Sequence, residues 1–242
     1  MKLVIIRHAE PDYSIDSVTQ KGGREAELLS ERLKRLDVNK IYCSPLGRAK
    51  DTAKPTLQKL GKEAEICDWL KEFPPRINDP YIKEQGRRCW DFMPSFWTKE
   101  EKYFDKDNWY NTPLMKEGGV KEEYEKVCKG LDGLLESHGY KRNGNMYEAV
   151  KPNSDTILLF CHFGVESIML SHLLNISPMP LLHGFVALPS SVTALATEER
   201  EKGKAYFRCS CYGDLSHLYV ADEPPSFAAR FCELYTNEDE RH

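Results

Sequence analysis

The chain has 242 residues, of which 40% are apolar and 30% charged, and its formal net charge is −4. A chain of this length can bury one substantial core, so we expect a single domain over residues 1–242. No apolar stretch approaches the roughly 20 residues of a membrane helix, and the acidic balance offers no general attraction for nucleic acid or anionic lipid. We therefore expect neither a membrane nor nucleic acid as a partner.

The N-terminus and the cysteines indicate a cytoplasmic protein. Arg7 ends the first apolar run too early for a signal-peptide core, and eight irregularly spaced cysteines are typical of reduced thiols. Cys209 and Cys211 form one close pair, with His217 as a further ligand nearby. These side chains do not complete the ligand set of a structural zinc site, so we expect no metal.

The first part of the chain alternates apolar runs with amphipathic stretches. Residues 3–6 predict a buried parallel strand, and a helix follows from Thr19, whose side chain can cap it. Residues 38–43 predict a second strand. Directly after it, Ser44-Pro45 predicts a helix with serine as the N-cap and proline in the first position. A third strand is expected at residues 64–70.

The middle of the chain is less regular. Pro55 is expected to break or kink the helix that begins at Ser44. Residues 73–119 mix aromatic side chains with charges and show no strand period, so we interpret them as an inserted cap packed over the sheet. An amphipathic helix is expected at 120–134, and a loop or hairpin at 139–155.

The insertion has two interpretations. Its aromatic residues form the small core of a cap, or some of them line the substrate entrance. In the second case an arginine of the insertion would meet a second acidic group on the substrate. The candidates are Arg76, Arg87 and Arg88.

The strongest buried-strand signal lies at residues 156–161, followed by His162 and a helical stretch at 165–174. Further strands are expected at 185–188, 192–196 and 205–211, with a hairpin joining the last two, and a short helix is expected after Pro224.

Basic and nucleophilic side chains follow the predicted strands. Arg7 and His8 come after the first, Arg48 lies just beyond the second, and His162 follows the strand at 156–161. The carboxyl ends of parallel strands carry the working residues of open α/β folds. Because two guanidinium groups and a helix N-terminus all favour phosphate oxygens, the pattern predicts a pocket for a phosphate dianion.

The two histidines permit covalent chemistry in that pocket. A neutral imidazole is a good nucleophile, so His8 would attack phosphorus while protonated His162 and the arginines balance the charge on the equatorial oxygens. The leaving oxygen needs a proton. Glu72 is the expected donor, which requires a raised pKa; Glu10, Asp68 or an acid of the insertion are alternatives.

Four segments in order resemble a known family: Arg7-His8-Ala9-Glu10, Thr19-Gln20-Lys21-Gly22, the run Ser44-Pro45-Leu46-Gly47-Arg48-Ala49-Lys50-Asp51-Thr52-Ala53, and Cys161-His162-Phe163-Gly164. Together they resemble the histidine phosphatase superfamily, also called phosphoglycerate mutase-like. The resemblance covers residues 1–72 and 155–220. It implies an α/β fold with a mixed, mostly parallel sheet flanked by helices on both faces, and no metal or organic cofactor. It also implies a phosphohistidine at His8, a phosphate pocket of Arg7, Arg48 and His162, and an acid at Glu72.

This sequence departs from the family pattern at several positions. Ala9 and Phe163 stand where the family more often has glycine, and Tyr13-Ser14 stands where mutases tend to carry Trp-Asn. The second departure favours a phosphatase acting on a small phosphorylated metabolite over a phosphoglycerate-type mutase. The Ser14 hydroxyl either binds phosphate or serves a turn.

A non-catalytic phosphoprotein-binding module is a more distant alternative. The intact set of His8, Arg48, His162 and a candidate acid argues against it. The sequence leaves the substrate and the oligomeric state open.

Overall fold

The computed structural model describes residues 1–78, 86–226 and 234–236. Within these residues, the largest sheet has eight strands in the order β5-β4-β10-β1-β11-β12-β9-β8. Its strands are β1 (Lys2–Arg7), β4 (Lys40–Cys43), β5 (Glu65–Ile66), β8 (Tyr140–Asn143), β9 (Met146–Ala149), β10 (Thr156–Cys161), β11 (Val192–Glu201) and β12 (Lys204–Asp214).

The sheet is mixed, as expected. The strands β5, β4, β10 and β1 pair in parallel, whereas β11, β12, β9 and β8 add antiparallel pairs. The expected predominance of parallel pairing therefore holds only for the half that begins at β5. The hairpins β8–β9 and β11–β12 supply two of the antiparallel pairs in the described sheet, because a hairpin can pair only in antiparallel fashion, and the pairs β1–β11 and β12–β9 supply the others.

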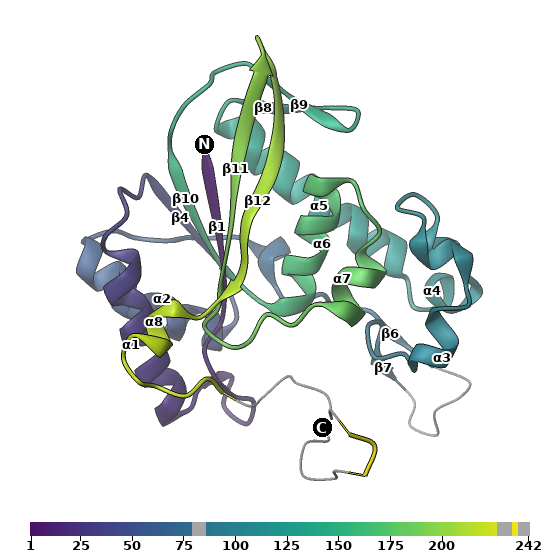
Figure 1. Ribbon diagram of the computed structural model, residues 1–242, viewed down its shortest axis with the longest axis horizontal. Helices are drawn as coiled ribbons and strands as arrows, with labels where there is room; N and C mark the ends of the chain where they lie inside the picture. Colours follow the sequence, from purple (N-terminus) through teal and green to yellow (C-terminus); the bar gives the residue numbers. More distant parts are fainter. Residues whose placement is uncertain (79–85, 227–233, 237–242) are drawn as a thin grey trace.

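Helices cover both faces of the sheet, as expected (Figure 1). On one side, α1 (Gln20–Leu33) packs against α2 (Gly47–Leu60), and α8 (Ser216–Tyr219) packs against α1. On the other side lie α5 (Val120–Ser137), α6 (Phe163–Leu174) and α7 (Pro178–Gly184). The Thr19 hydroxyl accepts the Gly22 N–H at 3.0 Å, which confirms the predicted cap of α1.

The start of α2 differs from the prediction. The helix begins at Gly47, with Leu46 in the N-cap position, so Ser44 is not its cap. The Ser44 hydroxyl instead lies 2.8 Å from His162 Nε2. Of the predicted break or kink at Pro55, the break is wrong, because α2 continues to Leu60. A proline removes one helical hydrogen bond, and packing of the buried face against the sheet and α1 compensates for that loss.

Two other predicted strands differ from the structure. The third strand is limited to β5, and a 3₁₀ turn at Asp68–Leu70 replaces the remainder. Residues 185–188 are described by the structure and form no strand. The helix expected after Pro224 falls on residues 227–233, which lie outside the described residues.

The inserted stretch consists of short elements. Their aromatic side chains enter the core on the α5–α6 face, where Tyr103 and Trp109 are fully buried. This stretch contacts α5 and α7, so these helices separate most of it from the sheet, contrary to the expected position over the sheet (Figure 1). Its elements are β6 (Arg76–Ile77), β7 (Arg87–Arg88), α3 (Pro94–Trp97), 3₁₀ turns at Glu101–Phe104 and Trp109–Asn111, and α4 (Pro113–Glu117). Across the described residues, no helix is long and apolar enough to span a membrane.

Candidate active site

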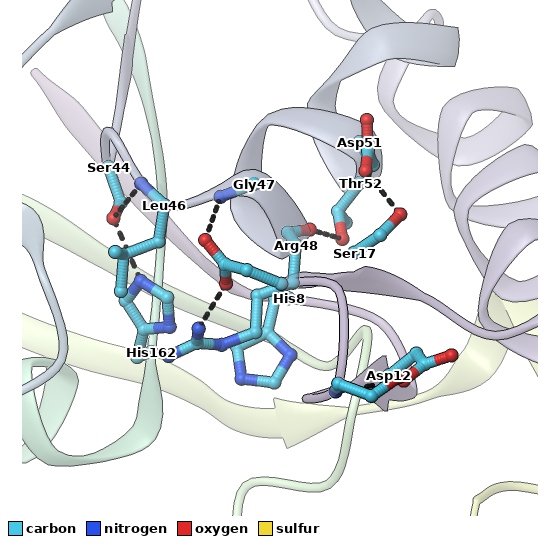
Figure 2. Close-up of polar contacts among 12 residues, drawn as sticks. His8, Asp12, Ser17, Ser44, Leu46, Gly47, Arg48, Asp51, Thr52 and His162 are labelled. Atoms are coloured by element: carbon cyan, nitrogen blue, oxygen red, sulfur yellow. Dashed lines mark hydrogen bonds and ion pairs between the residues drawn. The ribbon is translucent and has the colours of Figure 1, made fainter.

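Three adjacent parallel strands bring distant parts of the chain together at their carboxyl ends. Arg7 pairs with Cys161 at the ends of β1 and β10, and the His8 N–H donates to the Cys161 carbonyl at 3.0 Å. The Ser44 N–H donates to the Phe160 carbonyl at the end of β4. His8, Ser44 and His162 therefore occupy one region, next to the start of α2 (Figure 2).

His8 is a buried and oriented imidazole, with 1% of its surface exposed. Its Nδ1 lies 2.7 Å from the Ala9 carbonyl oxygen. Because a carbonyl can only accept, Nδ1 carries the proton and Nε2 keeps its lone pair. Burial, together with the nearby charge of Arg7, holds the pKa of His8 well below its usual value. The ring is thus neutral in the free pocket.

His162 stands at the N-cap of α6, and its ring centroid lies 5.1 Å from that of His8. Its Nε2 contacts the Ser44 hydroxyl at 2.8 Å, while its buried Nδ1 has no hydrogen-bond partner among the residues described. Burial, followed by His8 and the arginines, holds the pKa of His162 well below its usual value. His162 is therefore neutral in the free site, and its protonation during attack on phosphorus stays a prediction.

Two buried arginines supply the positive charge. Arg7 donates from Nη1 to the Ala187 carbonyl, and its guanidinium carbon lies 5.7 Å from the ring centroid of Phe163. Arg48 is the second residue of α2 and donates from Nη1 to Asp16 at 2.6 Å. Both guanidinium groups are therefore held in place before any anion binds.

Glu72 follows the 3₁₀ turn after β5 and reaches the N-terminus of α6. One carboxylate oxygen, Oε1, accepts the N–H groups of Phe73 at 2.8 Å, Gly164 at 2.9 Å and Val165 at 3.3 Å. Burial raises the pKa of Glu72 above its usual value, although the Phe73 N–H and the charge of Arg7 oppose the shift. Gly164 permits this approach, since a Cβ there would lie 2.7 Å from Oε1 and 2.8 Å from Trp90.

The other acids considered for proton donation are engaged elsewhere. Glu10 accepts hydrogen bonds from Thr19 and Ser226, and exposed Asp68 pairs with Lys71. Of Glu10, Asp68 and Glu72, only Glu72 binds the N-terminus of α6, where His162 is the N-cap.

Ser14 lies on an exposed turn, where its hydroxyl donates to Asp12 Oδ1 at 2.5 Å. This contact fits the turn role that the sequence allowed. The structure shows no contact between Ser14 and the other predicted site residues over the part of the chain it describes.

A family model described as histidine phosphatase superfamily, branch 1, matches residues 3–207. The chain belongs to this superfamily. A probable phosphatase of Schizosaccharomyces pombe is 36% identical over 233 residues, which are 90% of this chain and 95% of that protein. A shorter match, 33% identical over 70 residues, is to a 2,3-bisphosphoglycerate-dependent phosphoglycerate mutase of Thermoplasma acidophilum and covers 25% of this chain and 35% of that one.

Solved structures share the fold. A phosphoserine phosphatase mutant of Entamoeba histolytica superposes with a TM-score of 0.61 at 19% identity, over 90% of this chain and 98% of that one. A mycobacterial glucosyl-3-phosphoglycerate phosphatase gives 0.60 at 18% identity, over 88% and 98%. The mixed sheet with helices on both faces is thus the histidine phosphatase fold.

Three supporting side chains of this histidine phosphatase were not among the predicted site residues. Ser44 was assigned to a helix cap but contacts His162, and the Thr52 hydroxyl accepts the Ala9 N–H at 2.9 Å. Both residues belong to the segment at 44–53 that resembles the family, so their place in that motif could have marked them as candidate site residues. Asp16, the partner of Arg48, was in none of the motifs.

Proposed function

We propose that this histidine phosphatase hydrolyses small phosphorylated metabolites through a phosphohistidine at His8, without a metal or organic cofactor. The orientation of His8 is the observation that carries this proposal, because its Nδ1–H bond to Ala9 leaves the Nε2 lone pair for attack. The probable phosphatase activity of the Schizosaccharomyces pombe relative and the phosphatases that share the fold support a hydrolase.

In the first step, His8 Nε2 forms a bond to phosphorus while the bond from phosphorus to the ester oxygen breaks. Arg7, Arg48 and His162 bind the equatorial oxygens, and the phosphate dianion favours protonation of His162 because opposite charge raises its pKa. The Glu72 carboxyl transfers its proton to the leaving oxygen, and its raised pKa favours that protonated form.

In the second step, water attacks phosphorus and gives a proton to the Glu72 carboxylate. The bond between phosphorus and Nε2 breaks, which releases inorganic phosphate and restores neutral His8. Glu72 ends the cycle protonated, so protons and electrons balance over the two steps.

Arg88 is the arginine of the insertion that fits a role in substrate selection. Its charge lowers the pKa values of Glu72 and His162, and its guanidinium carbon lies 5.5 Å from the ring centroid of Trp90. Arg88 Nη1 also donates to the carbonyls of Phe73 at 3.2 Å and Pro74 at 3.4 Å, which hold it beside Glu72. Arg87 is paired with Asp91, and Arg76 donates to the Gly86 carbonyl. We infer that Arg88 meets a second acidic group, such as a carboxylate, on the substrate.

The catalytic proposal is tested with His8→Ala and wild type on a panel of phosphate esters. We expect wild type to release phosphate after treatment with a chelator and to form an acid-labile phosphoenzyme, and His8→Ala to do neither. Hydrolysis by His8→Ala at the wild-type rate would refute the mechanism. Transfer of labelled phosphoryl to an acceptor would identify a mutase, and binding of phosphate without turnover would identify a binding module.

The specificity proposal is tested with Arg88→Gln and the neighbouring control Arg87→Gln. We expect Arg88→Gln to raise KM for esters that carry a carboxylate and to leave p-nitrophenyl phosphate largely unaffected. An equal effect on both classes of ester, or the same selective loss in Arg87→Gln, would overturn the assignment.

A further inference from the structure

A short hairpin that follows the His8 segment folds back onto the start of α2. Its strands β2 (Pro11–Asp12) and β3 (Ser17–Val18) pair antiparallel, and Asp16 lies in the turn between them. Asp16 has a φ of 49°, a left-handed conformation that is uncommon for residues other than glycine. The hairpin thus holds one carboxylate in an unusual backbone position beside the pocket.

Both oxygens of that carboxylate are bound to α2. Oδ2 accepts the Gly47 N–H at 2.7 Å, and Oδ1 accepts from Arg48 Nη1 at 2.6 Å. The backbone approach is equally close, because a Cβ on Gly47 would lie 1.9 Å from the Asp16 carbonyl oxygen. Only glycine at position 47 is compatible with this contact.

We propose that Asp16 is a positioning residue for Arg48, fixing one edge of the guanidinium so that the other edge faces the transferred phosphoryl group. The proposal rests on the phosphatase reaction above. A guanidinium has two forked edges that match oxyanions, and Asp16 uses Nη1 alone. Arg48 Nε is buried and has no hydrogen-bond partner within the described ranges.

The surroundings of Asp16 and Arg48 support a fixed pair. The side chain of Arg48 is only 10% exposed, and its guanidinium carbon lies 5.4 Å from the ring centroid of Tyr13. Burial by itself raises the pKa of Asp16, but the hydrogen bonds from Gly47 and Arg48 outweigh it and lower the pKa below its usual value. Asp16 therefore stays ionised while it holds Arg48. Figure 2 shows Gly47 and Arg48 beside His8 and His162.

The same hairpin offers a matched control. Ser17 donates from its hydroxyl to Asp51 Oδ2 at 2.6 Å, which is a third hydrogen bond between the hairpin and α2 (Figure 2). This bond does not involve Arg48. Ser17→Ala therefore removes a bond between the hairpin and α2 without removing the Asp16 carboxylate.

The test is a double-mutant cycle of Asp16→Asn and Arg48→Ala, with Ser17→Ala as the control. Each protein is assayed for kcat and KM with p-nitrophenyl phosphate, and for binding of inorganic phosphate by calorimetry. We expect Asp16→Asn to lower kcat/KM by up to about a hundredfold, as a misplaced positioning group does, and to weaken phosphate binding. In the Arg48→Ala background the same substitution should have little further effect, and Ser17→Ala should stay close to wild type.

Three results would overturn the proposal. Tighter phosphate binding by Asp16→Asn would mean that the carboxylate competes with phosphate for Arg48. An undiminished effect in the Arg48→Ala background would mean that Asp16 does not act through Arg48. Equal losses in Asp16→Asn and Ser17→Ala would indicate a general loosening of the hairpin. If the His8 mechanism fails instead, His8→Ala keeps its phosphatase activity. The effect of Asp16→Asn on phosphate binding can still be measured by calorimetry in that case, so the two failures are distinguishable.

Discussion

Replacing Glu72 by glutamine separates its chemical role from its structural one. The amide oxygen of the introduced glutamine can still accept the N–H groups of Phe73, Gly164 and Val165, so we expect Glu72→Gln to cost less than about 1 kcal/mol of unfolding free energy. Glu72→Ala leaves these groups without their acceptor, and each buried unpaired N–H costs about 1–3 kcal/mol. Urea unfolding of both variants measures this difference.

The chemical effect should depend on the leaving group. General acid catalysis contributes about 10²–10⁴-fold, so Glu72→Gln should lower kcat by that factor for alkyl phosphates, whose leaving oxygen needs a proton. A p-nitrophenolate ion leaves without a proton, so p-nitrophenyl phosphate should be slowed much less. The assay is kcat for both esters in wild type and variant. Equal slowing of the two esters would refute the assignment of Glu72 as the acid.

Two further predictions concern stability and are measured by urea unfolding. Gly130→Ala should destabilise the protein by about 1–3 kcal/mol, because its Cβ would lie 2.3 Å from the Trp69 ring, whereas Gly133→Ala, with no atom within 4 Å, should stabilise it by about 0.5–1 kcal/mol. Effects of the same sign would contradict the packing argument. Burial raises the pKa of Glu25 from 4.5 to about 7, so its contribution to stability is full below pH 4.5 and is lost as the pH rises through 7. Glu25→Gln should therefore reduce the loss of stability between pH 5 and pH 8 by up to about 3 kcal/mol, and an unchanged pH dependence would exclude that titration.

The parts of the fold that were predicted from sequence are those with strong local signals. The apolar run before Arg7 and the run at 156–161 are parallel neighbours in the sheet, and each is almost wholly buried. Because the carboxyl ends of such strands meet, the proximity of Arg7, His8 and His162 followed from the pattern. The Thr19 cap of α1 is equally local.

The errors occur where a distant partner competes with a local rule. Ser44 has the sequence context of a helix cap, but His162, 118 positions away, takes its hydroxyl. The position of Glu72 after a strand made it a candidate acid, and that role stays a prediction, but the sequence did not show its hydrogen bonds to α6, 92 and 93 positions away. Asp16 pairs with Arg48 across 32 positions through a hairpin too short to show a strand period. Rules based on neighbouring residues, such as capping preferences and strand periodicity, cannot predict contacts between residues so far apart in the chain.

In the proposed mechanism, different groups of the pocket bind the phosphate and transfer the proton. Burial keeps His8 and His162 neutral in the free site, so in the proposed mechanism the positive charge that first meets the phosphate would come from Arg7 and Arg48. A guanidinium stays charged throughout the physiological pH range, so binding of the dianion does not depend on titration of the arginines. In the proposed mechanism the leaving group would instead take its proton from Glu72, and because burial raises the pKa of that carboxyl, we expect the first step to slow as the pH rises and Glu72 ionises. This separation of phosphate binding from proton transfer requires that the guanidinium groups keep their orientation in both steps. The contact with Asp16 would hold Arg48 in that orientation.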